Sequence, residues 1–465
     1  MQITKLSRLS EAENLFADSP INITTEGKRH LGAALGTEEF KFSYIDQKVS
    51  EWCIRLRKLS DIAKSQPHVA YSAYIHGEQH RYTYFLRTLE NIGENLKALD
   101  KVLEEVFIPT IFGRDITAEE REILSLQVKE GGLGLRKISA NAAITYQTSK
   151  SITAPLKSKI VSQSHNFPTE EEVASARLTT MQHVHNDQAA HANNVINQQP
   201  VELQRKLKQI SEPVASSWIG ALPLSQYGFN LNRGEFQDAL AMRYNKPLKN
   251  IPANCPCGKK FSTTHALSCT NGGFIHARHD NVRDFEAQLL KIVCNDVETE
   301  TMLQPVTNRN FERSANVSEE ARLDVRARGF WRQGQNAFFD VRITNETCQS
   351  QRDSTINSIL RKHEMEKKRQ YNQRVIEIEQ GTFTPLIFTT SGAMGHECHK
   401  FHKALAEKIS LKKDEQYTEI IRYICVHISF MVLKATLLCV RGSRSLKRNM
   451  EYGEDFSQTL LELGC

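Results

Sequence analysis

Apolar residues recur at intervals of three and four along the first third of the chain. Leu96, Leu99 and Leu103 show this spacing, which aligns apolar side chains on one face of a helix. The pattern extends from about residue 26 to about residue 153 and is broken at FIPTIFGR and KEGGLGLRK, where proline and glycine interrupt a helix. We therefore predict a helical domain over residues 1–165.

The pattern changes twice more along the chain. Residues 166–200 are mainly polar, and we predict a helical connector over residues 166–250. Beyond it, strand-like segments alternate with helical ones, which predicts an α/β region followed by C-terminal helices. The longest apolar run, Tyr423 to Val440, includes His427 and Lys434, so we expect a buried or docking helix and no membrane association.

Composition and charge add little to this picture. The chain has 465 residues, of which 40% are hydrophobic and 25% charged, as in ordinary globular proteins. The formal net charge of +6 permits contact with nucleic-acid phosphates without requiring it. The first residues, MQITKLSRLS, lack the apolar core of a secretory signal, so we expect an intracellular chain whose cysteines are reduced or metal-bound.

Four potential metal ligands lie close together in CPCGKKFSTTHALSC. Cys255, Cys257, His265 and Cys269 have a C-x-C-x7-H-x3-C spacing, and Gly258 lets the chain turn after the first pair. A short helix would present His265 and Cys269 on one face. Four protein ligands leave no open position, so the pattern predicts a structural Zn²⁺ site. The alternative is a chance grouping of buried cysteines with a core histidine.

The segment ARLDVRARGFWRQGQNAFFDVRITN predicts a β-hairpin with a turn from Gly329 to Gly334. If the turn is centred on Arg332, Asp324 lies directly across from Asp340. Two carboxylates that close repel each other unless a divalent cation such as Mg²⁺ or Mn²⁺ binds both. Such an ion activates water and stabilises the transition state of phosphodiester cleavage. We therefore predict that both aspartates bind a catalytic metal ion.

Strand alternation assigns the other hairpin side chains to two faces. Leu323 and Val325 are expected on one face of the first strand, whereas Asp340 and Arg342 share a face of the second. Arg342 could hold the scissile phosphate, but its permanent charge excludes it as a general base. The segment TPLIFTT is expected to extend the sheet. The alternative for the hairpin is a solvated element with surface charges.

The basic segment SILRKHEMEKKRQYNQRVIEIE predicts a helix. Lys368 and Tyr371, or Lys367 and Tyr371, lie one turn apart on it, and either lysine could supply the ammonium group that Arg342 does not. The arginines of the hairpin and the lysines of this helix surround two acids, which favours a nucleic-acid site.

Three more polar residues have open assignments. Glu286, in DFEAQLLKIV, is a candidate third acid near the metal or an exposed side chain. His276 and His279 follow the Cys/His motif and are candidate phosphate contacts, further ligands or ordinary helix-start residues. The spacing of these residues does not decide among the alternatives.

The order of these motifs resembles the C-terminal region of non-LTR retrotransposon proteins that carry a restriction-like endonuclease. In that family a Cys/His zinc motif follows the reverse transcriptase and precedes a nuclease of the PD-(D/E)xK class. Leu323-Asp324 matches the first acidic motif, with leucine in place of proline, and Asp340-Val341-Arg342 matches the second, with arginine in place of lysine. HVAYSAYIHGEQHRYTYFLRT, FIPTIFGR, KEGGLGLRK and TPLIFTTSGAMGHECHKF resemble segments of the same family.

The resemblance implies roles for residues of the site. Asp324 and Asp340 would bind the catalytic Mg²⁺ or Mn²⁺, and Arg342, Lys368 and Tyr371 would be the other catalytic residues. It also implies a mixed α+β fold. The expected order is a post-palm helical domain at 1–165, the connector, a zinc module at 251–280, a restriction-like endonuclease domain at 281–400 and C-terminal helices at 401–465.

The expected function is that of an endonuclease that nicks DNA in the nucleus, with element RNA as a further candidate ligand. Two adjacent aspartates, which a polymerase palm needs, do not occur in the sequence, so we expect a truncated element protein that does not polymerise by itself. Two other hypotheses are a catalytically inactive nucleic-acid-binding relic of a retroelement, and a host protein that binds partner proteins through its helices.

Overall fold

The structure is a computed structural model that describes residues 2–306, 311–351 and 353–442. It contains two compact units, Met1–Gln204 and Arg205–Cys465. Helices and strands are both present, so the mixed α+β class predicted from the sequence is confirmed.

The first unit is mainly helical. Its helices are α1 (Leu9–Leu15), α2 (Glu38–Ala63), α3 (Pro67–Ala73), α4 (Gln79–Thr88), α5 (Gly93–Val102), α6 (Ile108–Phe112), α7 (Ala118–Ser125), α8 (Ile138–Val161) and α9 (Glu170–Asn197). Its strands are the parallel pair β1 (Gln2–Ile3) and β2 (Ile23–Thr24), and the hairpin β3 (Gly27–His30) and β4 (Ala33–Gly36). The helical character predicted for this part of the chain is confirmed.

Of the breaks predicted in FIPTIFGR, the one at Gly113 is present, whereas the helix runs on through Pro109, because a π-helical segment (Leu103–Phe107) directly precedes it and accommodates the missing N–H. α6 ends at Gly113, whose left-handed φ of 66° suits a glycine. α7 begins after Thr117, whose hydroxyl accepts the Glu120 N–H while the Glu120 carboxylate accepts the Thr117 N–H. Leu96 and Leu99 of the apolar stripe are fully buried, as their spacing predicts.

α9 is a long polar helix that packs along α8. Ala192 and Val195 are the buried residues of α9, so most of its surface is solvated. α10 (Val201–Ile210) follows it, and the division between the two units falls within α10. The region predicted as a connector, 166–250, is thus shared between the units.

The second unit contains a four-stranded mixed sheet. Its strands, in spatial order, are β5 (Val297–Met302), β6 (Arg322–Arg328), β7 (Asn336–Thr344) and β8 (Thr382–Thr389). Its helices are α11 (Arg233–Arg243), α12 (Thr263–Ala266), α13 (Phe274–Val293), α14 (Ile356–Glu377), α15 (His396–Lys413) and α16 (Tyr417–Arg441). The Cys/His motif, the predicted hairpin and the apolar C-terminal helix all lie in this unit.

β6 and β7 form the predicted hairpin. Val325 pairs with Phe339 and Arg328 with Asn336, so the register is centred on Arg332 as expected. β5 pairs with β6 in the antiparallel direction, and β8 pairs with β7 in the parallel direction. A parallel neighbour requires a crossover connection, which α14 supplies. The segment TPLIFTT lies in β8, so its predicted place in the sheet is confirmed.

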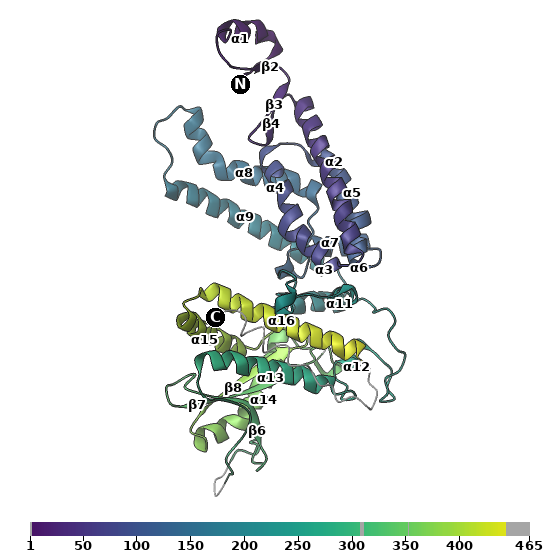
Figure 1. The fold of residues 1–465 in the computed structure, drawn as a ribbon, viewed down its shortest axis with the longest axis vertical. Helices are drawn as coiled ribbons and strands as arrows, with labels where there is room; N and C mark the ends of the chain where they lie inside the picture. The colour runs from purple at the N-terminus through teal and green to yellow at the C-terminus, as the bar shows by residue number, and fades with distance from the viewer. Residues whose placement is uncertain (1, 307–310, 352, 443–465) are drawn as a thin grey trace. The chain divides into compact units, whose positions relative to one another are not determined.

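Different helices cover the two faces of the sheet. One face carries Val325, Phe339 and Leu386 and packs against α13, α15 and α16 (Figure 1). The opposite face carries Phe338 and Ile387 and packs against α14. The inner strand β7 is therefore covered on both faces, whereas β5, at the edge of the sheet, is largely exposed.

The side-chain alternation of β6 changes at Asp324. Val325 packs on the α13 side of the sheet, whereas Leu323 packs with Phe338 on the α14 side. In β5 the facing residue is Glu300, which has a left-handed φ of 55°. The expectation that Leu323 and Val325 share a face was wrong, because regular alternation requires an undistorted strand.

α16 contains the longest apolar run of the chain. By length and composition it could cross a membrane, yet 67% of its most apolar window is buried within the protein. Ile424, Ile428 and Val432 lie in the core that covers the sheet, and the helix packs against α13 and α15. The structure therefore agrees with the expected buried helix.

Candidate functional site

The four predicted zinc ligands come together in the structure. The Cys255 Sγ lies 3.8 Å from the Cys269 Sγ, and the Cys257 Sγ lies 3.3 Å from the His265 Nε2. All four ligand atoms lie within 4.8 Å of one another. Tetrahedral zinc would place such atoms about 3.5–3.8 Å apart. The cluster could therefore hold a metal ion such as zinc.

The local backbone explains why these ligands converge. Gly258 has a left-handed φ of 86°, and its N–H donates to the Cys255 carbonyl and closes a tight turn. α12 begins after Ser262, whose hydroxyl accepts the His265 N–H. α12 ends at Ala266, and Cys269 lies beyond the turn that follows it. The expectation that one helix presents both later ligands was therefore wrong, although the ligands still meet.

The two cysteines of the turn differ in electrostatic environment. The backbone N–H of Lys259 lowers the pKa of the Cys257 thiol, which favours the thiolate. Burial raises the pKa of the Cys255 thiol. A bound metal ion would stabilise both thiolates, because metal binding releases protons from cysteine ligands.

One amide holds the Cys/His motif against the end of β7. The Asn345 Nδ2 donates to the Thr264 carbonyl at 3.1 Å and to the Ser268 Oγ at 2.9 Å. Thr264 and Ser268 directly precede His265 and Cys269 in the chain. The positions of two metal ligands and of the end of β7 are therefore coupled through Asn345.

Asp324 lies where β6 and β7 separate. The backbone pairing between the strands ends at Val325 and Phe339, so Asp324 and Asp340 are the next facing residues beyond it. The Asp324 carboxylate accepts the Val341 N–H at 2.6 Å and takes the place of a strand partner. The first predicted acid is thereby fixed beside the residue that follows the second.

Asp340 is 5% exposed and lies opposite α14. Its Oδ2 lies 2.6 Å from the Lys367 Nζ. Burial raises the pKa of the Asp340 carboxyl to about 6; Lys367 opposes this shift and the charge of Asp324 adds to it. The two predicted acids therefore interact electrostatically, and one of them is paired with a lysine.

The structure places Lys367, and not Lys368, at the acids. The Lys368 Nζ lies 2.6 Å from the Glu397 Oε1 of α15, so the expectation that Lys368 joins the site is not met. Lys367 is four residues after the buried His363, on the face of α14 that packs against the sheet. Lys368 lies about 100° further around the helix.

Tyr371 and Arg342 have partners near Lys367. The Tyr371 ring lies 5.6 Å from the Lys367 Nζ, and its hydroxyl accepts a hydrogen bond from the Asn316 Nδ2. The Arg342 Nη1 donates to the Glu366 Oε2 at 3.0 Å, and the Arg342 side chain is 37% exposed. Tyr371 thus packs against the site lysine, while Arg342 is partly open to solvent.

His363 fixes the wall of the site beside Arg342. The Gln351 Nε2 donates to the His363 Nε2, which leaves the Nδ1 proton to point at the Glu366 carboxylate at 2.9 Å. Burial lowers the pKa of His363, which favours this neutral form. The histidine therefore orients Glu366, which in turn holds Arg342.

His279, on α13, contacts the first acid. Its Nε2 lies 3.2 Å from the Asp324 Oδ2 and 3.1 Å from the Val341 carbonyl. Burial lowers the pKa of His279, but the hydrogen bonds and charges of Asp324 and Asp280 outweigh it and raise the value to about 9. A protonated imidazole therefore lies where two oxygen atoms converge. The sequence feature that could have identified His279 is its position three residues before the buried Val282, which puts the two side chains on the same face of α13.

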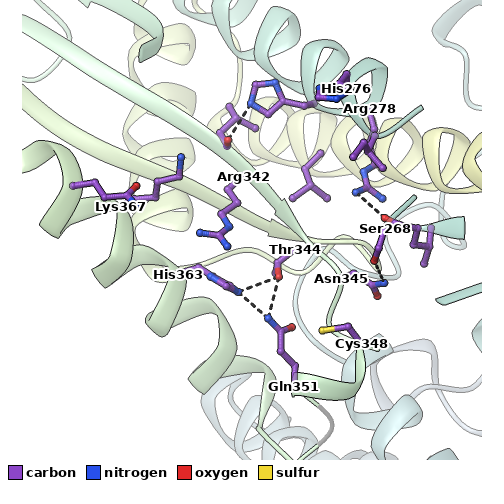
Figure 2. Close-up of a pocket in the computed structure, with 16 residues that line it drawn as sticks. Ser268, His276, Arg278, Arg342, Thr344, Asn345, Cys348, Gln351, His363 and Lys367 are labelled. Atoms are coloured by element: carbon purple, nitrogen blue, oxygen red, sulfur yellow. Dashed lines mark hydrogen bonds between the residues drawn. The ribbon is translucent and has the colours of Figure 1, made fainter. Parts of the chain in front are cut away.

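A cleft of about 710 Å³ opens between the Cys/His motif, the start of α13, the end of β7 and α14 (Figure 2). His279, Val341 and Lys367, which contact the two acids or lie between them, line part of it. Arg342 also lines the cleft, and among the residues that the structure describes no acidic one does so. A positive surface therefore borders two carboxylates that lie beneath it.

Glu286, the candidate third acid, belongs to another part of the core. Its Oε1 lies 2.8 Å from the His402 Nε2, and both side chains are fully buried. It is therefore not the exposed side chain considered above, and its partner is a histidine of α15 instead of a group of the acidic site.

Comparison with known protein families finds no match to the chain, and comparison with curated proteins also finds none. The functional assignment therefore depends on the residues of the site. The features that bear on it are the two aspartates, the lysine paired with one of them and the basic cleft beside them.

Proposed function

We propose that the protein is a metal-dependent endonuclease that nicks DNA. The observation that carries the proposal is the ion pair of the buried Asp340 with Lys367, next to Asp324 and beside a basic cleft. Two carboxylates and an ammonium group bordering a positive cleft suit the binding and cleavage of a phosphodiester. The sequence resemblance extends the proposal to the integration apparatus of a retroelement, acting in the nucleus, with element RNA as a second ligand.

Asp324 and Asp340 would hold a divalent cation such as Mg²⁺ or Mn²⁺. Their carboxylates and the Val341 carbonyl are hard oxygen donors, which suit these ions. Burial and the charge of Asp324 raise the pKa of Asp340 to about 6 against the opposing charge of Lys367, which supports this fit because a nearby cation relieves both effects. When bound, the ion would activate water and neutralise charge that develops on the phosphate.

The other residues would bind and orient the phosphate. Lys367 presents its ammonium group beside Asp340, where it can also contact a phosphate oxygen. Arg342 lines the cleft and uses Nη1 for Glu366, so its Nε and Nη2 are the groups that it would offer to the strand. Arg342 stays protonated and therefore binds phosphate without accepting a proton.

Nicking of supercoiled plasmid in Mg²⁺ or Mn²⁺ tests the proposal. We expect the wild type to nick, and Asp324→Asn and Asp340→Asn each to abolish nicking, because each substitution removes a charged metal ligand while keeping the size of the side chain. All proteins would be compared at matched zinc content. Metal-independent nicking, or activity retained by both variants, would contradict the proposal.

One observation favours a second function, that of a nucleic-acid-binding relic without catalysis. The protonated His279 lies 3.2 Å from the Asp324 Oδ2 and 3.1 Å from the Val341 carbonyl, at the place where a metal ion would be held. DNA binding without nicking in either metal ion would support this function.

A further inference from the structure

Arg278 is a buried arginine whose charge has few partners. The residue is 4% exposed, and its Nε and Nη1 have no hydrogen-bond partner among the residues that the structure describes. The contact of its Nη2 is a long one, 3.4 Å from the Leu267 carbonyl. A buried guanidinium normally makes several short hydrogen bonds. Arg278 therefore has unused capacity to bind an anion.

Arg278 lines the same cleft as the proposed catalytic residues. It lies toward the Cys/His motif, where Figure 2 shows its guanidinium pointing toward Ser268 and Asn345. His276, two residues before Arg278 on α13, is exposed and also lines the cleft. Lys367 lies on the α14 side. The cleft thus extends from the acidic pair to the Arg278 guanidinium, and the described residues that line it include no acid.

The energetics of burial favour an external partner for Arg278. A guanidinium that loses its hydration without an anion is unfavourable, and burial accordingly lowers the pKa of Arg278. Cys439 and the charge of Glu346 oppose this shift, but the Glu346 Oε2 accepts hydrogen bonds from the Thr390 N–H and Oγ1. No ion pair joins Arg278 and Glu346 in the described part of the chain.

We propose that Arg278 forms a second phosphate subsite at the Cys/His end of the cleft. It would take a backbone phosphate of the nucleic-acid strand next to the phosphate held at Asp340 and Lys367. The planar fork of a guanidinium suits two oxygen atoms of one phosphate. The identification of the ligand as a strand under cleavage rests on the proposed function, whereas the presence of an anion subsite does not.

Binding of a DNA oligonucleotide without divalent metal, at several salt concentrations, tests the subsite. For Arg278→Met we expect a melting temperature equal to or above that of the wild type, because an apolar side chain fits a buried position better. The dissociation constant should rise by about 10-fold. In a plot of its logarithm against the logarithm of the salt concentration, the slope should fall by about one.

Arg283→Met is the matched control, on the same helix. The Arg283 guanidinium already pairs with Asp280, Asp284 and Glu300, so its loss should leave the affinity for DNA within about 2-fold of the wild type. An equal loss of affinity in both variants would overturn the subsite. A lower melting temperature of Arg278→Met with unchanged affinity would also overturn it, by assigning Arg278 as a countercharge for Glu346.

Arg278→Lys keeps the proposal testable if Arg278→Met does not fold. It retains the charge but loses the fork, so we expect an unchanged salt slope with about 10-fold weaker binding. Unchanged affinity would overturn the subsite. Because the assay needs no cleavage, weaker binding by Arg278→Met with an inactive wild type would leave the subsite standing while the nuclease fails. If the wild type nicks and Arg278→Met binds DNA as tightly as the wild type, the nuclease would stand and the subsite would fail.

Discussion

The buried ion pair of Asp340 and Lys367 sets the electrostatics of the site. Without Lys367, burial and the charge of Asp324 would raise the pKa of Asp340 further, and the carboxyl would take up a proton near neutral pH. A protonated Asp340 binds a divalent cation poorly. Lys367 thus keeps its partner in the charged state that the proposed metal binding requires.

Replacing Lys367 should therefore reduce nicking far more than replacing its neighbour. We expect Lys367→Met to lower the nicking rate by about 100-fold, because it removes both a phosphate contact and the countercharge of Asp340. Lys368→Met, which removes an ion pair with Glu397, should remain close to the wild type. Equal rates for the two variants would argue against the assigned role of Lys367.

The second residue-scale prediction concerns the acid sensitivity of folding. Burial lowers the pKa of His427 to about 4, and its ring stacks on Phe285 at a centroid distance of 4.3 Å. Unfolded histidine protonates below about pH 6.5, whereas native His427 remains neutral to about pH 4. Between these values the unfolded state binds more protons, so stability falls as the pH is lowered.

His427→Phe should remove this sensitivity. Urea unfolding should show that the wild type loses up to about 3 kcal/mol more than His427→Phe between about pH 6.5 and about pH 4. His185→Gln, at an exposed position of α9, should keep the wild-type dependence. Parallel pH profiles for the wild type and His427→Phe would refute the assignment.

Several residues of the site could be identified from the sequence because their signals are local. The spacing of the Cys/His motif and the register of the hairpin placed the four ligands, Asp324 and Asp340. To choose between Lys367 and Lys368, one must know which face of α14 packs on the sheet, and the spacing of residues over one helical turn does not define this face. His279 and Arg278 reach the site through the packing of α13 against β7, a contact far apart in sequence.

At the scale of elements, the side chain of Asn345 connects the Cys/His cluster to the end of β7 through hydrogen bonds. Its amide donates to the residues that precede His265 and Cys269. A well-ordered Cys/His cluster therefore requires a well-ordered end of β7, and the end of β7 likewise requires the cluster. Loss of the metal should therefore loosen the wall of the cleft as well as the Cys/His motif itself.

Asn345→Ala should uncouple the two elements. With zinc content equal to that of the wild type, we expect amide hydrogen exchange in residues 264–268 and 344–348 to become ~30-fold faster, since the two hydrogen bonds that join the elements contribute about 2 kcal/mol. Thr347 is left out of this comparison, because its N–H donates directly to the Asn345 Oδ1. Chelation of zinc from the wild type should produce the same pattern. Unchanged exchange at β7 in both experiments would show that the elements are independent.

Elements governed by short-range rules were predictable and those shaped by their neighbours were not. The capping box at Thr117 and the turn at Gly329 follow from local chemistry. The alternation of β6 was lost at Asp324 because the side chain, and not the backbone, bonds to β7 at that point. Strict alternation along a strand does not predict a position where a side chain accepts the hydrogen bond that the backbone of the strand would otherwise accept.

At the scale of the whole molecule, the core of the second unit is self-contained. The cluster that covers the α13 side of the sheet uses residues from Val214 to Val432, all after Arg205. The proposed catalytic groups, the Cys/His cluster and the cleft also lie after Arg205.

A fragment of residues 205–465 should therefore fold alone. We expect one cooperative unfolding transition, about one bound zinc per chain and the nicking activity of the full chain, because the core and all the site residues are retained. Circular dichroism during heating and metal analysis would check this. A fragment that melts without cooperativity would show that the first unit is needed for folding.

The hydrogen bond from Val341 to Asp324 has a consequence for how this protein changes over evolutionary time. A lineage that had lost the proposed nuclease activity would still need an acceptor for that backbone N–H, so selection on folding alone would preserve Asp324. The Asp340 and Lys367 pair is different, since apolar residues can replace a buried ion pair together at little cost in stability. Among descendants of this chain, retention of the pair would mark retention of the proposed cleavage, whereas retention of Asp324 would mark only a maintained fold.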